Sequence, residues 1–565
     1  MHTNTSRRTF VKGLAAGGLL GGLGLWRTPV WAVTSPGEPQ VLAGTDFDLF
    51  IGETPVNITG NPRTAMTING GIPGPLLRWR EGDTVTLRVK NKLNADTSIH
   101  WHGILLPANM DGVPGLSFHG IEPGGMYVYQ FKVRQNGTYW YHSHSGLQEQ
   151  SGVYGPLVID AKEPEPFQYD RDYVVMLTDW TDEDAVDLMK TLKKQSDYYN
   201  YNKPTVGDFI HDVSEKGWGS TVADRKMWAE MKMNPTDLAD VSGATYTYLM
   251  NGQAPNSNWT GVFRPGEKLR LRFINGSAMT YFDVRIPGLK MTVVAADGLH
   301  VKPVSVDEFR IAVAETFDVI VEPTEAVYTL FAQSMDRTGF ARGTLAAKAG
   351  LSAPVPPLDP RPRVTMDDMG MGGMDHGSMA GMDHSAMAMP GMQSHPATEN
   401  NNPLVDMQAM TTAPKLDDPG LGLRNNGRRV LTYSDLRSTF VDPDGREPSR
   451  TIELHLTGHM EKFAWSFNGV KFSDAEPVRL KYGERVRVVL VNDTMMTHPI
   501  HLHGMWSDLE DENGEFMVRK HTIDMPPGSR RSYRVTADAL GRWAYHCHLL
   551  YHMEMGMFRE VRVEE

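Results

Sequence analysis

The strongest chemical pattern in this chain is His546-Cys547-His548, which His552 and Met557 follow. Cys547 is the only cysteine in 565 residues. Successive side chains on an extended strand point to opposite faces, so Cys547 can face one metal ion while its two neighbours face another. One thiolate, imidazoles and a distant thioether are the ligands of a blue-copper electron-transfer centre. The pattern therefore predicts a one-electron centre that a short covalent path connects to a second metal site.

Other histidines of the chain extend this pattern. Three further His-x-His pairs occur, and these are His100 and His102, His142 and His144, and His501 and His503. With His546 and His548 they make eight imidazoles, which suit a trinuclear copper cluster. The remaining set, His498, Cys547, His552 and Met557, suits one mononuclear copper. A single pair is weak evidence, because many such histidines are satisfied in a core, but four pairs beside a lone cysteine favour metal binding.

The four histidine segments resemble the four copper-binding signatures of multicopper oxidases, the family that contains laccases, ascorbate oxidase and bacterial cuprous oxidases. The resemblance covers essentially the whole mature chain. It implies four copper ions, namely one type 1, one type 2 and two type 3, and an oxidoreductase that uses O2 as acceptor. The implied type 2 ligands are His100 and His501, and the implied type 3 ligands are His102, His142, His144, His503, His546 and His548. The implied type 1 ligands are His498, Cys547 and His552, with Met557 axial.

The same resemblance implies how electrons and protons would move. Electrons would enter one at a time through the exposed edge of His498 or His552 and cross Cys547, a catalytic residue in this sense, to the cluster. Four such transfers reduce O2 to two waters and consume four protons. Asp111, eleven residues after His100, matches the acidic position that relays protons in related bacterial oxidases. Its Asp-Gly context suits a plain turn equally well.

An internal repeat predicts the domain organisation. Three segments run from a glycine to an asparagine nine residues later, with alternating apolar residues between them, and these are Gly82 to Asn91, Gly266 to Asn275 and Gly483 to Asn492. Apolar alternation with glycine turns is typical of half-buried strands. We therefore predict an all-β protein with three consecutive β-sandwich domains, called cupredoxin domains in the family it resembles. Their expected ranges are 45–165, 170–348 and 431–565.

The repeat also predicts which domains hold metal. Nine and eleven residues after Asn91 lie His100 and His102, and the same counts after Asn492 reach His501 and His503. The same counts after Asn275 reach no histidine. We therefore expect domains one and three to share the cluster, with domain two as a spacer without copper ligands. The type 1 site belongs to domain three, because only there does a cysteine stand between the paired histidines.

A methionine-rich segment separates domains two and three. We expect residues 349–430 to form a flexible linker, since residues 366–392 include nine methionines, with His376 and His384, and few bulky apolar groups. The methionines could be neutral filler. Alternatively they bind labile copper, because thioethers favour Cu(I) and tethered weak sites raise its local concentration. Such inserts resemble those of copper-resistance multicopper oxidases of the copper resistance protein A type.

The N-terminus predicts export. Arg7 and Arg8 lie in a twin-arginine motif, an apolar stretch at 13–25 is too short to span a membrane, and Ala32 ends a small-residue cleavage site. We expect a signal peptide at 1–32, recognition by the twin-arginine translocase, and a folded, monomeric periplasmic protein that is not embedded in a membrane. A net charge of −12 gives no support for nucleic-acid binding.

The electron donor stays open at this level. Cu(I) oxidation, which would contribute to copper resistance, is favoured by the methionine-rich segment. A laccase-like phenol oxidase would need an organic pocket over the type 1 histidines. A copper-sequestering protein would use the methionine-rich segment alone. Residues 198–233 look like an insertion in domain two, to which the sequence assigns no role.

Overall fold

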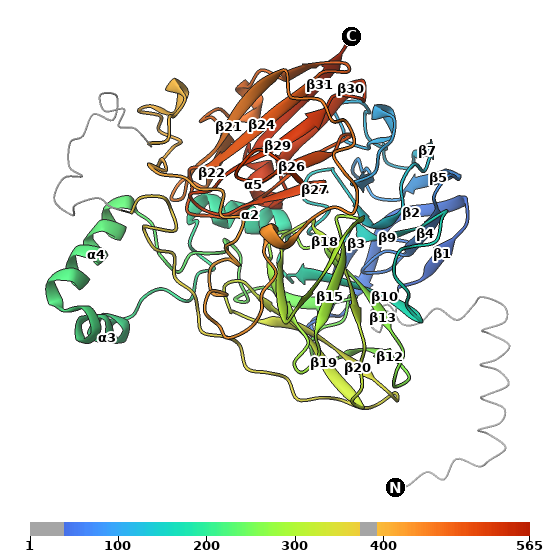
Figure 1. Ribbon diagram of the computed structural model, residues 1–565, viewed down its shortest axis with the longest axis horizontal. Helices are drawn as coiled ribbons and strands as arrows, with labels where there is room; N and C mark the ends of the chain where they lie inside the picture. Colours follow the sequence, from blue (N-terminus) through green and yellow to red (C-terminus); the bar gives the residue numbers. More distant parts are fainter. Residues whose placement is uncertain (1–38, 373–391) are drawn as a thin grey trace, which may run out of the picture.

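The computed structural model describes residues 39–372 and 392–565 (Figure 1). Its described strands form six sheets, which pair into three sandwiches in chain order. The prediction of an all-β protein with three β-sandwich domains is confirmed. In Figure 1 domain one is blue, domain two is green to yellow, and domain three is orange to red. The predicted signal peptide and residues 373–391 of the methionine-rich segment lie outside the described residues.

Domain one consists of sheets with the strand orders β1-β4-β9-β8-β6 and β3-β2-β5-β7. Its first strand begins before the expected boundary at residue 45. The strands are β1 (Val41–Ala43), β2 (Asp46–Val56), β3 (Arg63–Ile68), β4 (Leu76–Arg80), β5 (Thr84–Asn91), β6 (His100–His102), β7 (Met126–Lys132), β8 (Gly137–His142) and β9 (Tyr154–Asp160).

Domain two repeats this arrangement, with the orders β11-β10-β13-β18-β15-β16 and β12-β20-β19-β14-β17. Its strands are β10 (Arg171–Trp180), β11 (Thr247–Met250), β12 (Trp259–Val262), β13 (Leu269–Asn275), β14 (Phe282–Arg285), β15 (Met291–Ala296), β16 (Leu299–Val306), β17 (Glu308–Ile311), β18 (Thr316–Val321), β19 (Val327–Ser334) and β20 (Phe340–Ala346).

Domain three has the orders β22-β21-β24-β29-β26-β27 and β23-β31-β30-β25-β28, position for position those of domain two. Its strands are β21 (Arg450–His459), β22 (Ala464–Phe467), β23 (Val478–Lys481), β24 (Arg485–Asn492), β25 (His498–Leu502), β26 (Ser507–Glu510), β27 (Phe516–Lys520), β28 (Thr522–Met525), β29 (Arg530–Thr536), β30 (Gly541–Cys547) and β31 (Phe558–Glu564).

The asparagine of the sequence repeat has a structural role in every domain. Asn91, Asn275 and Asn492 end the equivalent strands β5, β13 and β24, and each side-chain amide donates to two carbonyls. The accepting residues are Ala95 and Ile121, Thr280 and Ile311, and Met496 and Met525 respectively. Buried carbonyls need such partners. The asparagine therefore fixes the loop that leads to the next strand, which carries histidines in domains one and three.

Helices are few in the described chain, and three of its four α-helices lie in an insertion between β10 and β11. This insertion holds α2 (Ala185–Lys194), α3 (Val206–Lys216) and α4 (Trp218–Met231), and Figure 1 shows α3 and α4 projecting away from the sheets. Asp184 caps α2, and Thr205 begins α3 in a capping box. The other helices are α5 (Leu550–Glu554), η1 (Ala108–Met110), η2 (Ala397–Glu399), η3 (Tyr433–Asp435) and η4 (Phe472–Asp474). Within the described ranges, no helix has the length and apolar character needed to cross a bilayer.

The linker between domains two and three differs from the flexible segment that the sequence suggests. On both sides of the gap at 373–391, its described residues pack against the domains. Met369 and Met407 are buried in the main hydrophobic core, as are Val364 and Leu416. The physical reason is that its scattered apolar side chains cover the surface of two neighbouring domains, so the linker needs no core of its own.

Candidate metal centre

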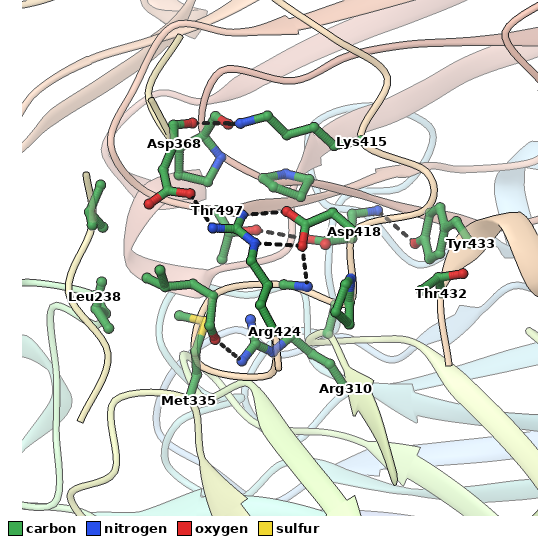
Figure 2. A pocket seen from close by; sticks show the side chains of 18 of the residues that line it. Leu238, Arg310, Met335, Asp368, Lys415, Asp418, Arg424, Thr432, Tyr433 and Thr497 are labelled. Atoms are coloured by element: carbon green, nitrogen blue, oxygen red, sulfur yellow. Dashed lines mark hydrogen bonds and ion pairs between the residues drawn. The ribbon is translucent and has the colours of Figure 1, made fainter. Parts of the chain in front are cut away.

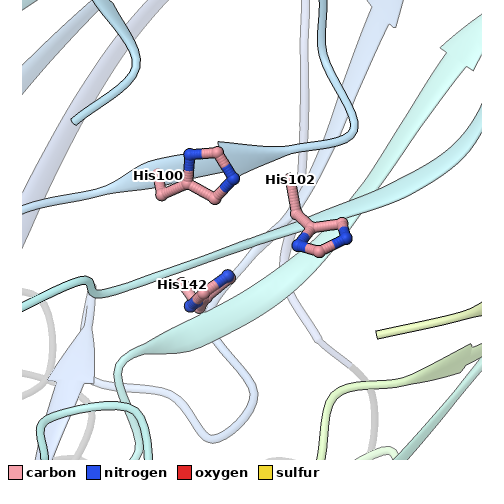
Figure 3. Close-up of side chains that lie close together, drawn as sticks. All are labelled: His100, His102 and His142. Carbon is pink, nitrogen blue, oxygen red and sulfur yellow. The ribbon is translucent and has the colours of Figure 1, made fainter. Parts of the chain in front are cut away.

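Two strand pairs place histidines at the boundary between domains one and three. In domain one β6 pairs with β8, so that His100 lies opposite His142. Figure 3 shows His100, His102 and His142 on these two neighbouring strands. In domain three β25 pairs with β30, so that His501 lies opposite His546. The same pairing in both domains presents two matching sets of imidazoles to one another.

The two sets converge across the boundary. His546 Nε2 lies 3.3 Å from Nε2 of His144 and 3.1 Å from Nε2 of His503. His548 Nε2 lies 3.3 Å from Nε2 of His142. Metal–nitrogen bonds of about 2.0–2.1 Å place the nitrogens of a tetrahedral site roughly 3.3 Å apart. The spacing of the imidazoles therefore fits shared metal ions.

The protonation state of the cluster also suits metal binding. Burial, followed by the proximity of the other imidazoles, holds the pKa well below the ordinary value for His102, His142, His144, His501, His503 and His548. Burial lowers the pKa of His546 to about 3. Neutral imidazoles keep a lone pair for a metal ion.

Asp111, the predicted proton relay, lies against this cluster. Its buried carboxylate places Oδ2 2.8 Å from Nδ1 of His503 and Oδ1 3.3 Å from Nδ1 of His100. Its main-chain carbonyl lies 2.8 Å from the same His100 nitrogen. Asp111 therefore contacts one imidazole from each of the two domains on the side away from the converging nitrogens.

Two groups beside the cluster were missed by reasoning from the sequence. Glu149 is buried, with Oε2 2.7 Å from Nδ1 of His142, and it orients that ring in the way carboxylates orient metal-binding histidines. His521 Nδ1 lies 3.1 Å from Nε2 of His102. Neither belongs to a His-x-His pair. An acidic residue seven positions after His142 was the available signal for Glu149.

The predicted mononuclear site forms within domain three. His498 Nδ1 lies 3.2 Å from Nδ1 of His552 and 3.5 Å from Sγ of Cys547, and Sγ lies 4.0 Å from Nδ1 of His552. Nitrogen and sulfur ligands at about 2.0–2.3 Å from one ion would lie roughly 3.3–3.8 Å apart. Burial raises the pKa of the Cys547 thiol well above its ordinary value, so a cation is needed to hold the thiolate.

Met557, the predicted axial ligand, lies next to this triad along the backbone. It is buried, its N–H donates to the carbonyl of His552, and its carbonyl accepts from the N–H of Cys547. These bonds hold the loop between α5 and β31 against the end of β30.

The expectation of an exposed histidine edge at this site is wrong. His498 and His552 are each 0% exposed. Nε2 of His498 lies 2.8 Å from the hydroxyl of Thr494, and Nε2 of His552 lies 2.7 Å from Oδ2 of Asp240. Asp240 lies after α4 in the insertion of domain two, so a segment of another domain covers the edge that the sequence suggested was open.

Asp240 belongs to a pair of buried carboxylates. Burial, and then the charge of Asp240, raise the pKa of Asp237 well above its ordinary value. Within the described part of the chain, Oδ1 of Asp237 and Oδ1 of Asp240 have no hydrogen-bond partner. Two adjacent buried carboxylates with free oxygens favour a cation beside them.

A pocket lies where the linker meets domains two and three (Figure 2). Its charged residues pair with one another: Arg424 contacts Asp368 at 2.6 Å and also Asp418, and Lys415 donates to the carbonyl of Asp368 at 2.6 Å. None of the predicted type 1 ligands lines it. This pocket therefore does not provide an organic-substrate site over the type 1 histidines.

The comparison with known families agrees with this geometry. Three multicopper oxidase domain families match the chain, at residues 51–164, 171–349 and 445–565. A copper resistance protein A homolog from Pseudomonas syringae pv. tomato is 80% identical, with 100% of both chains covered. The chain is a member of the multicopper oxidase family. It is therefore an oxidoreductase that uses copper and O2, as the sequence predicted.

Further relatives of this multicopper oxidase cover most or all of its length. Copper resistance protein A from Escherichia coli is 73% identical over 100% of both chains. Among solved structures, Fet3p, a multicopper oxidase that functions in iron import, has a TM-score of 0.63 at 19% identity, covering 93% of this chain and 91% of its own. The laccase from Botrytis aclada has a TM-score of 0.62 at 22% identity, covering 95% and 89%. At these identities the solved structures support the fold alone.

Proposed function

We propose that this multicopper oxidase couples one-electron oxidation of Cu(I) to four-electron reduction of O2 to water in the periplasm, and so contributes to copper resistance. The names of the 80% and 73% identical relatives support the role in resistance. The choice of Cu(I) as the electron donor rests on the Asp237–Asp240 pair, because Asp240 contacts His552 of the mononuclear site.

We assign four copper ions to the two ligand groups. Type 1 copper would be held by His498, Cys547, His552 and axial Met557, and type 2 copper by His100 and His501. The type 3 pair would be held by His102, His142, His144, His503, His546 and His548. Bound there, copper supplies electron uptake at the mononuclear site and reduction of O2 at the cluster.

The carboxylate pair would hold a copper ion close to the mononuclear site and favour its oxidation. Asp240 contacts His552 directly, so a cation held by the free oxygens of Asp237 and Asp240 would be one side chain away from a type 1 ligand. Oxygen ligands favour Cu(II) over the softer Cu(I), so they make loss of the electron easier. Cys547 then joins the two sites, because its peptide neighbours His546 and His548 both face the cluster.

This proposal predicts that Asp240→Asn lowers kcat/KM for Cu(I) by about 10- to 100-fold, the usual effect of losing a group that supports a metal ligand. A smaller loss is expected with a dimethoxyphenol, which does not need the carboxylate as a ligand. The measurement is O2 uptake by the copper-loaded protein with each donor. Glu230→Gln, which removes an exposed carboxylate of α4 from the same insertion, is the matched control.

Each result of this measurement has a distinct meaning. Selective loss of Cu(I) oxidation in Asp240→Asn supports the proposal. Uptake with the phenol alone would instead indicate a laccase-like enzyme. Tight copper binding with no uptake from either donor would indicate a copper-sequestering protein.

We also propose that Asp111 holds a proton for O2 reduction, because it contacts His100 and His503 from the outside of the cluster. Asp111→Asn keeps the size of the side chain and the hydrogen-bond acceptor but cannot carry the proton. We expect turnover to fall about 100-fold or more, the lower end of typical general-acid contributions. The dependence of turnover on pH should also change. An unchanged profile, with normal copper content, would leave Asp111 the role of a turn residue.

The methionine-rich segment is proposed to hold labile copper, and the twin-arginine translocase to export the folded chain. The packing of Met369 means that a clean deletion should begin after residue 373. Deleting residues 374–391 should lower Cu(I) oxidation at low copper concentration and leave phenol oxidation unchanged or faster. Equal effects on both donors would contradict a role in copper delivery.

A further inference from the structure

A second group of histidines and carboxylates lies outside the copper sites described above. His395 and Glu399 belong to the linker where it returns toward domain three, and Glu399 ends η2. His455 lies in β21, and Asp493 directly follows β24. The group therefore joins the linker to two adjacent strands of domain three.

Four polar side chains of this group converge on one point. Nδ1 of His395 lies 3.3 Å from Oε2 of Glu399 and 3.3 Å from Oδ2 of Asp493. Nδ1 of His455 lies 3.7 Å from Oε1 of Glu399 and 2.6 Å from Oδ2 of Asp493. Ligands of one tetrahedral ion lie about 3.3 Å apart. Three of the four separations are near this value. The fourth, between His455 and Asp493, is a hydrogen bond that a bound ion would replace.

The outer atoms of these side chains are held as they are in metal sites. Nε2 of His395 lies 3.0 Å from the carbonyl of Ala409, and Nε2 of His455 lies 3.2 Å from Oε1 of Glu453. Both acceptors hold the Nε2 side of each ring, so that Nδ1 of each ring faces the two carboxylates. The carboxylates are also fixed, since Asp493 Oδ1 accepts from the N–H of Ala409 at 2.8 Å. Glu399 Oε2 accepts from the amide of Gln408 at 3.0 Å.

Burial leaves this centre incompletely satisfied. Glu399, His455 and Asp493 are buried, and within the described residues Oε1 of Glu399 and Nδ1 of His395 have no hydrogen-bond partner. Imidazolium cations paired with the carboxylates are the alternative. In that case Nδ1–H of His395 would lie between two carboxylate oxygens, 3.3 Å from each. Burial alone would lower the pKa of His395, but the two carboxylates outweigh it and raise this pKa to about 10, so a metal ion would have to displace a proton.

We propose that His395, Glu399, His455 and Asp493 bind one divalent transition-metal ion, Cu²⁺ or Zn²⁺. Two imidazoles and two carboxylates suit divalent ions and not the softer Cu(I). The bound ion would tie the return of the linker to domain three, and it would lie one residue from Thr494, whose hydroxyl contacts His498. The inference does not depend on which donor the enzyme oxidises.

The test measures extra metal on the full-length, copper-loaded protein. After equilibrium dialysis against Zn²⁺, elemental analysis should find one Zn²⁺ equivalent in the wild type that is lost from His395→Ala and from Glu399→Gln. Both variants should keep the copper content and O2 uptake of the wild type. His300→Gln is the matched control, because His300 is also a partly buried histidine beside a carboxylate, with Glu165 at 3.4 Å. Isotopically labelled Cu²⁺ added to the Zn²⁺ form should displace the ion if the site prefers copper.

Equal Zn²⁺ content in the wild type and both variants would overturn the proposal, as would no extra equivalent in the wild type. If a variant loses copper through misfolding, anomalous diffraction at the zinc edge from Zn²⁺-soaked wild-type crystals decides the question. A peak between the four side chains supports the site, and no peak there overturns it.

Discussion

Domains two and three have the same strand order but very different interiors. In both, an asparagine ends the central strand and fixes the loop that follows, Asn275 in β13 and Asn492 in β24. Six residues after that asparagine, domain three has His498, whereas domain two has Tyr281. Tyr281 donates to Asp524 of domain three at 2.8 Å. One copy thus provides a proposed metal ligand where the other provides a contact between domains.

Domain two fills its equivalent region with a charge network. Asp283, two residues after Tyr281, contacts Arg310 at 2.7 Å and Arg337 at 2.6 Å, and Asp283 and Arg337 have completely buried side chains. Burial alone would raise the pKa of Asp283, but the two guanidinium groups outweigh it and lower the pKa. The fold therefore sets where a buried polar centre is placed, and the side chains decide whether that centre is an ion pair or a metal site.

The largest effect is expected from removing the cysteine thiolate, which domain three alone contains. Cys547→Ser keeps the size of the side chain but removes the thiolate, so the blue absorption should vanish. Turnover should fall by about 1000-fold or more, beyond the 10- to 100-fold typical for a supporting group. Optical spectra and O2 uptake measure this, with the thermal midpoint as a check on folding. Turnover within about 10-fold of the wild type would show that the mononuclear site is not on the electron path.

The next effect concerns the charge network of domain two. Asp283→Ala leaves the buried guanidinium group of Arg337 and the largely buried one of Arg310 without their carboxylate, which should cost about 3–5 kcal/mol of stability. Copper-loaded protein that remains folded should turn over normally, because domain two holds no predicted copper ligand. Thermal unfolding and activity per bound copper are the measurements. Asp187→Ala, which breaks an exposed pair with Lys190, should change neither.

The smallest effect compares one residue in two domains. Asn275→Ala and Asn492→Ala each remove the amide donor to two carbonyls, which should cost about 1–3 kcal/mol of stability in total. Only Asn492→Ala should also shift the blue absorption, because its loop leads to His498. An equal shift of the blue absorption in both variants would contradict the prediction that each asparagine affects only the loop of its own domain.

Patterns along single strands made much of the protein predictable. The nine-residue repeat gave the central strands, and the His-x-His spacing gave the ligand groups, because both depend on strand geometry that repeats every two residues. The sequence predicted less about segments that lack such periodicity. The linker looked flexible because its apolar residues are sparse, yet Met369 and Met407 pack into the core that neighbouring domains provide.

By itself, the sequence determined the fold class, the two domains that carry the His-x-His pairs and the place of the single cysteine, since each follows from residue type and local spacing. The tertiary structure alone decided which distant groups meet those residues. Asp240 covers His552 from 312 positions away, and Glu399 meets His455 through a linker that spacing does not place. Such contacts depend on how whole domains pack, and packing brings together residues whose separation along the chain carries no period.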